Sequence, residues 1–221
     1  MAYDTLILSR EESFAVITLN RPPANAISEP LIHELNAALN ELLPDDAVRA
    51  VVLTGSGERI FCGGADLGSA FSGGDVEAFI RFGNSVMRKM ERFPKPIIAA
   101  INGHAMGGGC EIAMACHLRL LKETARMGQT ESNLGIIPGY GGTQRLPRLI
   151  GRTKALAGQL GKRAPLAMAG IIKAVDEGLE SPMARSIDVE LDAFMPTLRS
   201  EDAAEGIQAF FGKREPEFKG R

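Results

Sequence analysis

The stretch of sequence that decides the fold covers residues 99–146 and reads AAINGHAMGGGCEIAMACHLRLLKETARMGQTESNLGIIPGYGGTQRL. It contains nine glycines and three glutamates, of which Glu111 and Glu131 each follow a short glycine-containing segment. Glycine lets the backbone approach a ligand closely, because it has no Cβ atom. The stretch therefore predicts a site at which backbone N–H groups and two carboxylates meet a ligand.

Local patterns place these residues on elements. Residues 97–101 form an apolar run after two prolines, which predicts a buried strand. Residues 110–121 are mostly apolar and predict a helix that begins at three glycines. The start of a helix has free N–H groups and the positive end of the dipole, so Gly108 is a candidate donor to a developing oxyanion. One such donor is worth roughly 3–4 kcal/mol in a transition state.

Simpler explanations exist for each feature when it is taken alone. The glycine triplet is also typical of a close helix–strand contact, Glu111 of an ordinary acid in the first turn of a helix, and Glu131 of a cap on the following turn. Two nucleotide-binding motifs are excluded. No Gly-Lys-Ser/Thr follows the glycines, and Gly103 and Gly107 do not have the G-x-G-x-x-G spacing.

Composition limits the class of protein. The 221 residues suffice for one domain with a sizeable core, and 45% hydrophobic with 24% charged residues is typical of a globular chain. A net charge of −2 gives no basic surface for nucleic acid. Residues 1–12 lack the basic start of a signal peptide, and no apolar run is long enough to span a membrane.

The cysteines and histidines indicate neither disulfides nor a metal. Cys62, Cys110 and Cys116 form no C-x-x-C motif, and we expect reduced structural thiols in a cytoplasmic protein. The histidines show no metal-ligand spacing with the cysteines.

The rest of the chain repeats one plan of strand, glycine loop and helix. Apolar runs predict strands at 14–19 and 49–54. Ser28 is the expected N-cap of a helix whose apolar stripe includes Leu31, Leu35, Leu39 and Leu42. Further helices are expected over 76–93, over 166–179 with Pro165 in the favoured position at its start, over 186–198, and after Ser200.

Taken together, these motifs resemble the crotonase superfamily, the enoyl-CoA hydratases and isomerases. The resemblance rests on the segments Asn20-Arg21-Pro22, Asn25-Ala26, Phe61-Cys62-Gly63-Gly64-Ala65-Asp66-Leu67, Asn102-Gly103, Gly107-Gly108-Gly109-Cys110-Glu111, Gly128-Gln129-Thr130-Glu131 and Gly135 through Leu146. It implies an α/β fold, a spiral of repeated ββα units with C-terminal trimerisation helices.

The resemblance also implies roles for individual residues. The N–H groups of Ala65 and Gly108 form the oxyanion hole, and Glu111 and Glu131 hold water and exchange the proton at the α-carbon. Asp66 more plausibly ties its loop together than takes part in chemistry. The residues expected to bind substrate or CoA are Arg21, Ala24, Gly63, Gly64, Asp66, Leu67, Gly107, Gln129, Pro138, Gly139 and Gly141.

The implied activity is hydration of trans-2-enoyl-CoA to 3-hydroxyacyl-CoA, by a homotrimer or a dimer of trimers. No metal or redox cofactor is implied, since CoA is part of the substrate. Another reaction of the superfamily is the main alternative: double-bond isomerisation, decarboxylation or thioester hydrolysis. A non-catalytic CoA-binding or assembly protein is the alternative from a different class.

One break interrupts the resemblance. A helix and a strand that family members have after the segment ending at Leu156 are absent here, so we place a junction between residues 156 and 157. Either residues are missing from the printed sequence at this point, which we favour, or the gene has a deletion. We expect a spiral core with the CoA and catalytic site over 1–156 and a helical oligomerisation region over 157–221.

Overall fold

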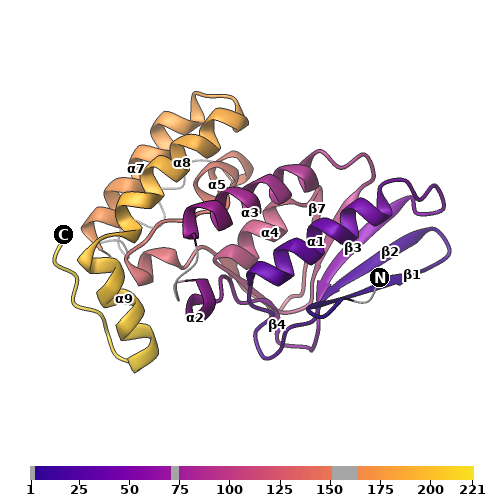
Figure 1. Cartoon of the computed structure of the whole chain (residues 1–221), viewed down its shortest axis with the longest axis horizontal. Helices are drawn as coiled ribbons and strands as arrows, with labels where there is room; N and C mark the ends of the chain where they lie inside the picture. Colours follow the sequence, from indigo (N-terminus) through magenta and orange to yellow (C-terminus); the bar gives the residue numbers. More distant parts are fainter. Residues whose placement is uncertain (1–2, 71–74, 151–163) are drawn as a thin grey trace. The chain divides into compact units, whose positions relative to one another are not determined.

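The structure, a computed structural model, describes residues 3–70, 75–150 and 164–221 (Figure 1). The chain divides into two compact units, Met1–Gly128 and Gln129–Arg221. The junction and domain boundary that we predicted at 156/157 lie outside the described residues, so both stay predictions.

The first unit is built on a five-stranded sheet with the order β1-β2-β3-β5-β7. Its strands are β1 (Leu6–Arg10), β2 (Phe14–Leu19), β3 (Ala50–Gly55), β5 (Ile97–Ile101) and β7 (Leu118–Leu121). Only the β1–β2 pair is antiparallel among these neighbours, and the register of the parallel pairs sets Ile17 beside Leu53 and Leu53 beside Ala99. Parallel neighbours need crossover connections, as the repeated strand–loop–helix plan predicted.

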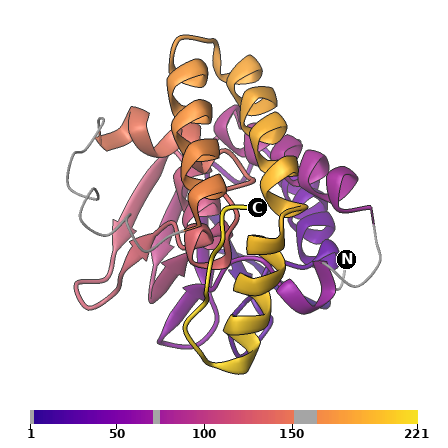
Figure 2. The same cartoon turned by 90° about the vertical axis from the view of Figure 1, so that its left-hand side faces the viewer.

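Two helices, α1 (Glu29–Leu42) and α3 (Val76–Glu91), pack against each other on one side of this sheet (Figures 1 and 2). The predicted N-cap is confirmed, because the Ser28 hydroxyl accepts a hydrogen bond from the Leu31 N–H at 3.4 Å. The predicted apolar stripe of α1 is fully buried. Asp75 caps α3 in the same way, accepting from the Ala78 N–H at 3.0 Å.

A second, smaller sheet carries the glycine loops. It consists of three parallel strands, β4 (Ile60–Cys62), β6 (His104–Met106) and β8 (Met127–Gly128). Helix α2 (Leu67–Ala70) follows β4 after the Gly63–Gly64 loop, and helix α4 (Gly108–Ala115) follows β6 at once. Every residue of α4 is buried, and the helix contacts both β4 and β6. This sheet therefore brings the loop after β4 next to the start of α4.

Asn102 fixes the turn between β5 and β6. Its amide nitrogen donates to the carbonyls of Gly55 and Gly57 at 2.9 and 2.7 Å, and its amide oxygen accepts from the Gly55 N–H at 3.0 Å. A Cβ atom on the next residue, Gly103, would lie 2.4 Å from the Arg59 carbonyl oxygen. Asn102 is thus required for its side-chain hydrogen bonds, and Gly103 is required because there is no space for a Cβ atom.

The helix predicted over 110–121 is wrong in its second half. Helix α4 ends at Ala115, Cys116 is extended with ψ 156°, and β7 pairs with β5 from Leu118 onward. His117 holds this change of direction, since its N–H donates to the Ile97 carbonyl and its ring Nδ1 accepts from the Ile97 N–H. The apolar residues of β7 are largely exposed at the edge of the sheet, with Leu120 67% accessible.

The second unit is helical. It contains the 3₁₀ helix η1 (Glu131–Leu134) and the helices α5 (Gly142–Ile150), α7 (Pro165–Leu179), α8 (Met183–Leu198) and α9 (Glu201–Gly212). Helices α7 and α8 lie side by side, α5 contacts both, and α9 packs on η1 (Figure 2). The predicted starts at Pro165 and Ser200 are confirmed, whereas α8 begins three residues earlier than the predicted 186.

Candidate active site

Asn25 joins the segment that contains Arg21 and Ala24 to the segment that leads into Gly63, Gly64 and Ala65. Its amide nitrogen donates to the carbonyls of Ser56, Ile60 and Phe61 at 3.1–3.2 Å, and its amide oxygen accepts from the Arg21 N–H at 3.1 Å. The residue is buried and has a φ of 49°, which few side chains other than asparagine adopt readily. Asn25, which the sequence indicates only as part of a motif, thus holds the loop before Ala65 in place.

Arg21 and Asp66 form an ion pair of 2.6 Å across the same two segments. Asp66 also accepts a hydrogen bond from the Gly68 N–H at 3.2 Å. These contacts support the interpretation that Asp66 ties its loop together.

The Ala65 N–H points away from its neighbouring segment. Ala65 forms a parallel bridge with Ile27, in which the Ile27 N–H donates to the Gly64 carbonyl and the Asp66 N–H donates to the Ile27 carbonyl, both at 2.8 Å. In such a bridge the groups of the central residue face the other side. Among the described residues, the Ala65 N–H has no hydrogen-bond acceptor.

The start of α4 meets this loop. Gly107 is the N-cap of the helix, with a φ of 53°, and its N–H donates to the Gly128 carbonyl at 2.9 Å. Gly108 is the first residue of the helix. A Cβ atom built on Gly64 would lie 3.0 Å from the Met106 carbonyl oxygen and 3.5 Å from the Gly108 nitrogen. The residue before Ala65 therefore lies directly beside Gly108.

Two backbone donors from separate loops are thus brought together within the first unit. Like that of Ala65, the N–H of Gly108 finds no acceptor in the part of the chain that the structure describes. Glycine is needed at position 64 because the backbone there approaches Met106 and Gly108 closely and because its φ is 101°. Such a pair of unused donors suits an oxygen that gains negative charge.

Glu111 belongs to the same unit and lies in the first turn of α4. Its side chain is 1% exposed, and its N–H donates to the Gly107 carbonyl at 3.1 Å. Burial of a carboxylate at this depth is uncommon for an acid whose only task is to favour a helix start. Ala65, Gly108 and Glu111 are the predicted chemical groups that the first unit brings together.

Glu131 opens η1 at the start of the second unit and is 9% exposed. Burial, and to a smaller extent the charge of Glu190, raises the pKa of its carboxyl to about 7, against hydrogen bonds from the backbone of Glu131 and Thr130. With its amide nitrogen turned towards Glu131, Gln129 donates to the two carboxyl oxygens of Glu131 at 2.9 and 3.2 Å. A carboxyl with this pKa exchanges protons readily at neutral pH.

The predicted contacts Pro138, Gly139 and Gly141 lie on the loop between η1 and α5, and all three are buried. Gly141 has a φ of 89°, and a Cβ atom there would meet the Arg145 guanidinium and lie 2.8 Å from the Ile187 side chain. The Gly141 N–H donates to Glu190 of α8 at 2.5 Å. Glu190 is completely buried, and the sequence reading missed it because its helix alternates acids with apolar residues as an exposed helix does.

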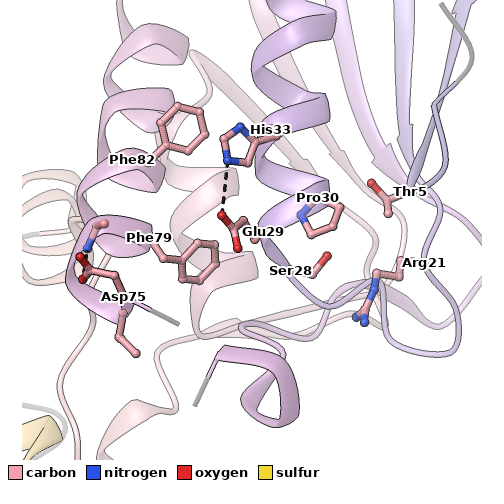
Figure 3. Close-up of a pocket in the computed structure, with 11 residues that line it drawn as sticks. Thr5, Arg21, Ser28, Glu29, Pro30, His33, Asp75, Phe79 and Phe82 are labelled. Carbon is pink, nitrogen blue, oxygen red and sulfur yellow. Dashed lines mark hydrogen bonds and ion pairs between the residues drawn. The ribbon is translucent and has the colours of Figure 1, made fainter. Parts of the chain in front are cut away.

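A hollow of about 580 Å³ opens beside Arg21, between the first turns of α1 and α3 (Figure 3). Phe79, Phe82 and His33 line it, and the His33 ring stacks on Phe82 with 4.3 Å between ring centres. Its volume is within the range of small-molecule sites. Of the residues predicted to bind substrate or CoA, Arg21 is the one among its lining residues.

A family model described as enoyl-CoA hydratase/isomerase matches residues 9–158, well over half of the chain. The chain belongs to the enoyl-CoA hydratase/isomerase family. The resemblance inferred from the glycine loops and the two glutamates is thereby confirmed.

Individual members of the family are similar over nearly their whole length. A probable enoyl-CoA hydratase of Bacillus subtilis is 36% identical, covering 98% of this chain and 99% of its own. A crotonyl-CoA hydratase of Syntrophomonas wolfei is 35% identical over 99% of both chains. The crystal structure of an enoyl-CoA hydratase from Bacillus anthracis has a TM-score of 0.66 at 32% identity and covers 99% of this chain and 100% of its own. The α/β fold of the family is confirmed by this match.

The alignment with the B. subtilis family member runs over 257 positions, although the present chain has 221 residues. The relative therefore has residues without a counterpart here. Where the gap lies, near 156/157 or elsewhere, stays a prediction.

Three further observations concern the described residues alone. They contain no group of three or more histidine, cysteine or acidic side chains placed to hold a metal ion. None of their helices is long and apolar enough to cross a membrane. The three cysteines are all buried and form no disulfide with one another, and burial raises the pKa of the Cys62 and Cys116 thiols to about 12.

Proposed function

We propose that this protein adds water across the double bond of trans-2-enoyl-CoA thioesters and forms 3-hydroxyacyl-CoA. The observation that carries the proposal is the pair of unused N–H groups of Ala65 and Gly108, set side by side by Gly64. They would donate to the thioester oxygen and stabilise the negative charge that it gains as the double bond is attacked. The family member named crotonyl-CoA hydratase supports a short enoyl chain as the first substrate to test.

The two glutamates would move the protons. Glu111 takes a proton from water as the water oxygen bonds to C3, and Glu131 gives its proton to C2, so that one water molecule is added in total. Transfer of a proton from Glu111 to Glu131 through solvent then restores both groups. The raised pKa of Glu131, about 7, keeps a substantial fraction of this carboxyl protonated at neutral pH, as an acid requires.

CoA enters as part of the substrate, and the proposal involves no other cofactor. Arg21, Ala24, Gly63, Gly64, Asp66, Leu67 and Gly107 of the first unit, and Gln129, Pro138, Gly139 and Gly141 of the second, are the proposed substrate and CoA contacts. A homotrimer or a dimer of trimers is part of the proposal, as is a cytoplasmic location, which the free cysteines support.

Hydration is favoured over isomerisation because both acids are present, whereas isomerases of the superfamily often keep only one. The test is a spectrophotometric panel of enoyl-CoA substrates of increasing chain length, starting with crotonyl-CoA and following loss of the conjugated thioester absorbance. Product analysis distinguishes a hydroxyacyl-CoA from a shifted double bond, a lost carboxylate or free CoA. Binding of CoA without turnover of any substrate would favour the non-catalytic alternative, and an intact mass of 23.6 kDa would then attribute it to a deletion in the gene.

A further inference from the structure

Glu190 of α8 is a buried acid that the proposed reaction does not use. Its side chain is 0% exposed, and three groups at the start of α5 donate to its carboxylate. These are the Gly141 N–H at 2.5 Å, the Thr143 N–H at 2.8 Å and the Thr143 hydroxyl. A carboxylate that satisfies the free N–H groups of a helix start is stabilised by the helix dipole as well. Glu190 therefore caps a helix from a different element.

This cap fixes the loop that leads from Glu131 to α5. Two backbone groups of the loop are held by side chains. The Gly141 N–H donates to Glu190, and the Tyr140 carbonyl accepts from the Arg145 guanidinium. At the other end, the Ile136 N–H donates to the Glu131 carbonyl at 3.3 Å. Movement of the cap would consequently reach both the proposed contacts on the loop and Glu131.

The two buried acids also interact through their charges. Burial raises the pKa of Glu190 to about 7, opposed by its hydrogen bonds to Thr143 and Gly141 and by the charge of Arg145. The charge of Glu190 in turn raises the pKa of Glu131. Two carboxyls in one field bind their protons in coupled steps. Both carboxyls accept hydrogen bonds, but only Glu190 has a cation, the Arg145 guanidinium, among the groups that lower its pKa, so the negative charge is favoured on Glu190 and the proton on Glu131.

Other charged groups of the neighbouring elements are accounted for. On α5, Arg148 donates to the Gln144 and Gly178 carbonyls. On α7, Lys173, Asp176 and Glu177 are exposed to solvent. On α9, the buried Asp202 accepts from the N–H groups of Lys219 and Gly220 at 2.6 and 2.9 Å.

From this geometry we infer that Glu190 is a positioning residue for the proposed hydration: its ionised carboxylate fixes the 138–141 loop and keeps Glu131 in the protonated form that delivers a proton to C2. The inference rests on the proposed function for the role of Glu131. The arrangement of Glu190, Gly141 and Thr143 does not depend on it.

The test compares three variants with wild type over pH 5 to 9, measuring kcat and KM with crotonyl-CoA. Glu190→Gln removes the charge, so the pKa of Glu131 falls and the loss of kcat on the alkaline side begins about one pH unit lower. At pH 7 its kcat falls about fivefold and returns towards the wild-type value near pH 5.5. Glu190→Asp keeps a carboxyl group but withdraws it from Gly141 and Thr143, so KM rises, and the loss of kcat on the alkaline side moves in the same direction as in Glu190→Gln by a smaller amount. Asp192→Asn, an exposed acid on the same helix, changes neither.

A second measurement needs no turnover. The ¹³C chemical shift of the Glu131 carboxyl, assigned by its loss in Glu131→Gln, is followed against pH in wild type and in Glu190→Gln. A lower titration midpoint in Glu190→Gln supports the inference even if wild type fails to hydrate crotonyl-CoA, in which case the proposed function alone is wrong. If Glu190→Gln does not fold, Thr143→Val takes its place, because loss of the hydroxyl donor destabilises the Glu190 charge and shifts the midpoint the same way by less.

A cap with a structural role alone would behave differently. Activity in Glu190→Gln would then fall by the same factor at every pH, with an unchanged Glu131 midpoint. That result would overturn the inference.

Discussion

Gly109 packs so closely against Cys62 that a Cβ atom on Gly109 would lie 2.2 Å from the Cys62 carbonyl oxygen. The contact joins α4, which begins with the proposed donor Gly108, to β4, which leads into the loop that carries the proposed donor Ala65. It shows that the close helix–strand contact and the donor site, which the sequence offered as alternatives for the glycine triplet, are compatible. Gly109 supplies the contact and Gly108 the N–H.

The first prediction concerns this contact. Gly109→Ala forces α4 and β4 apart, and overpacking of this kind destabilises a protein by about 1–3 kcal/mol. Urea unfolding measures the change in the free energy of unfolding. Gly128→Ala is the matched control, because a Cβ atom there meets nothing within 4 Å, and we expect a change below about 0.5 kcal/mol. Equal stability of the two variants would show that the backbone adapts at no cost.

The second prediction concerns the oxyanion hole. Gly108→Val places a branched side chain on the proposed donor, and the loss of one such donor lowers kcat by about 10²–10³. The variant should still fold, as circular dichroism checks, and Gly128→Ala serves as the control for activity. A folded Gly108→Val with full activity would refute the assignment.

The third prediction separates the two glutamates. Glu→Gln at either 111 or 131 keeps the shape but removes proton transfer, so hydration of crotonyl-CoA falls by about 10²–10⁴. Affinity for CoA should change little, and the double variant should be hardly worse than the worse single one, since groups that act as a unit are not additive.

Deuterium incorporation at C2 of a saturated acyl-CoA, followed by NMR, assigns their roles. Exchange should persist in Glu111→Gln and vanish in Glu131→Gln. The opposite pattern would reverse the roles, and wild-type hydration by both variants would exclude the two-glutamate mechanism.

The fourth prediction is a pH dependence of stability. The pKa of Glu131, about 7 in the folded chain, lies above that of an exposed glutamate. The folded state therefore binds this proton more tightly than the unfolded state, and the stability gained is present below pH 4.5 and lost as pH rises through 7. Glu131→Gln cannot ionise at this position. We therefore expect the difference in free energy of unfolding between Glu131→Gln and wild type to change in favour of the variant by on the order of 2 kcal/mol from pH 5 to pH 8. Urea unfolding at both values checks this, and Asp192→Asn should show no such gain.

The fifth prediction concerns assembly. Leu118 and Leu120 of β7, and Phe210 and Phe211 of α9, are each 57–67% exposed, which is unusual for large apolar side chains. Light scattering should give three or six times the chain mass of 23.6 kDa. Phe210→Ser with Phe211→Ser should shift the particles towards smaller species if α9 takes part. A stable, active monomer at micromolar concentration would contradict the prediction.

Strands β2 and β5 and helices α1, α7 and α9 could be predicted because each has a local signal: an apolar run, an N-cap or a proline at the first turn. Strand β7 could not, since its leucines continue the apolar pattern of α4 and only pairing with β5 makes them a strand. Glu190 was missed for a related reason: its burial depends on contacts with Gly141 and Thr143, nearly fifty residues earlier in the chain.

Asn102 has a consequence for how samples of the protein age. Asparagine followed by glycine is the pair most prone to spontaneous deamidation, and Asn102 precedes Gly103. The product, an aspartate or isoaspartate, would turn a donor into a negatively charged acceptor facing the carbonyls of Gly55 and Gly57. Long storage at alkaline pH would thus weaken the hydrogen bonds that connect the end of β5 to the end of β3. Mass spectrometry would detect the change as a gain of about one dalton.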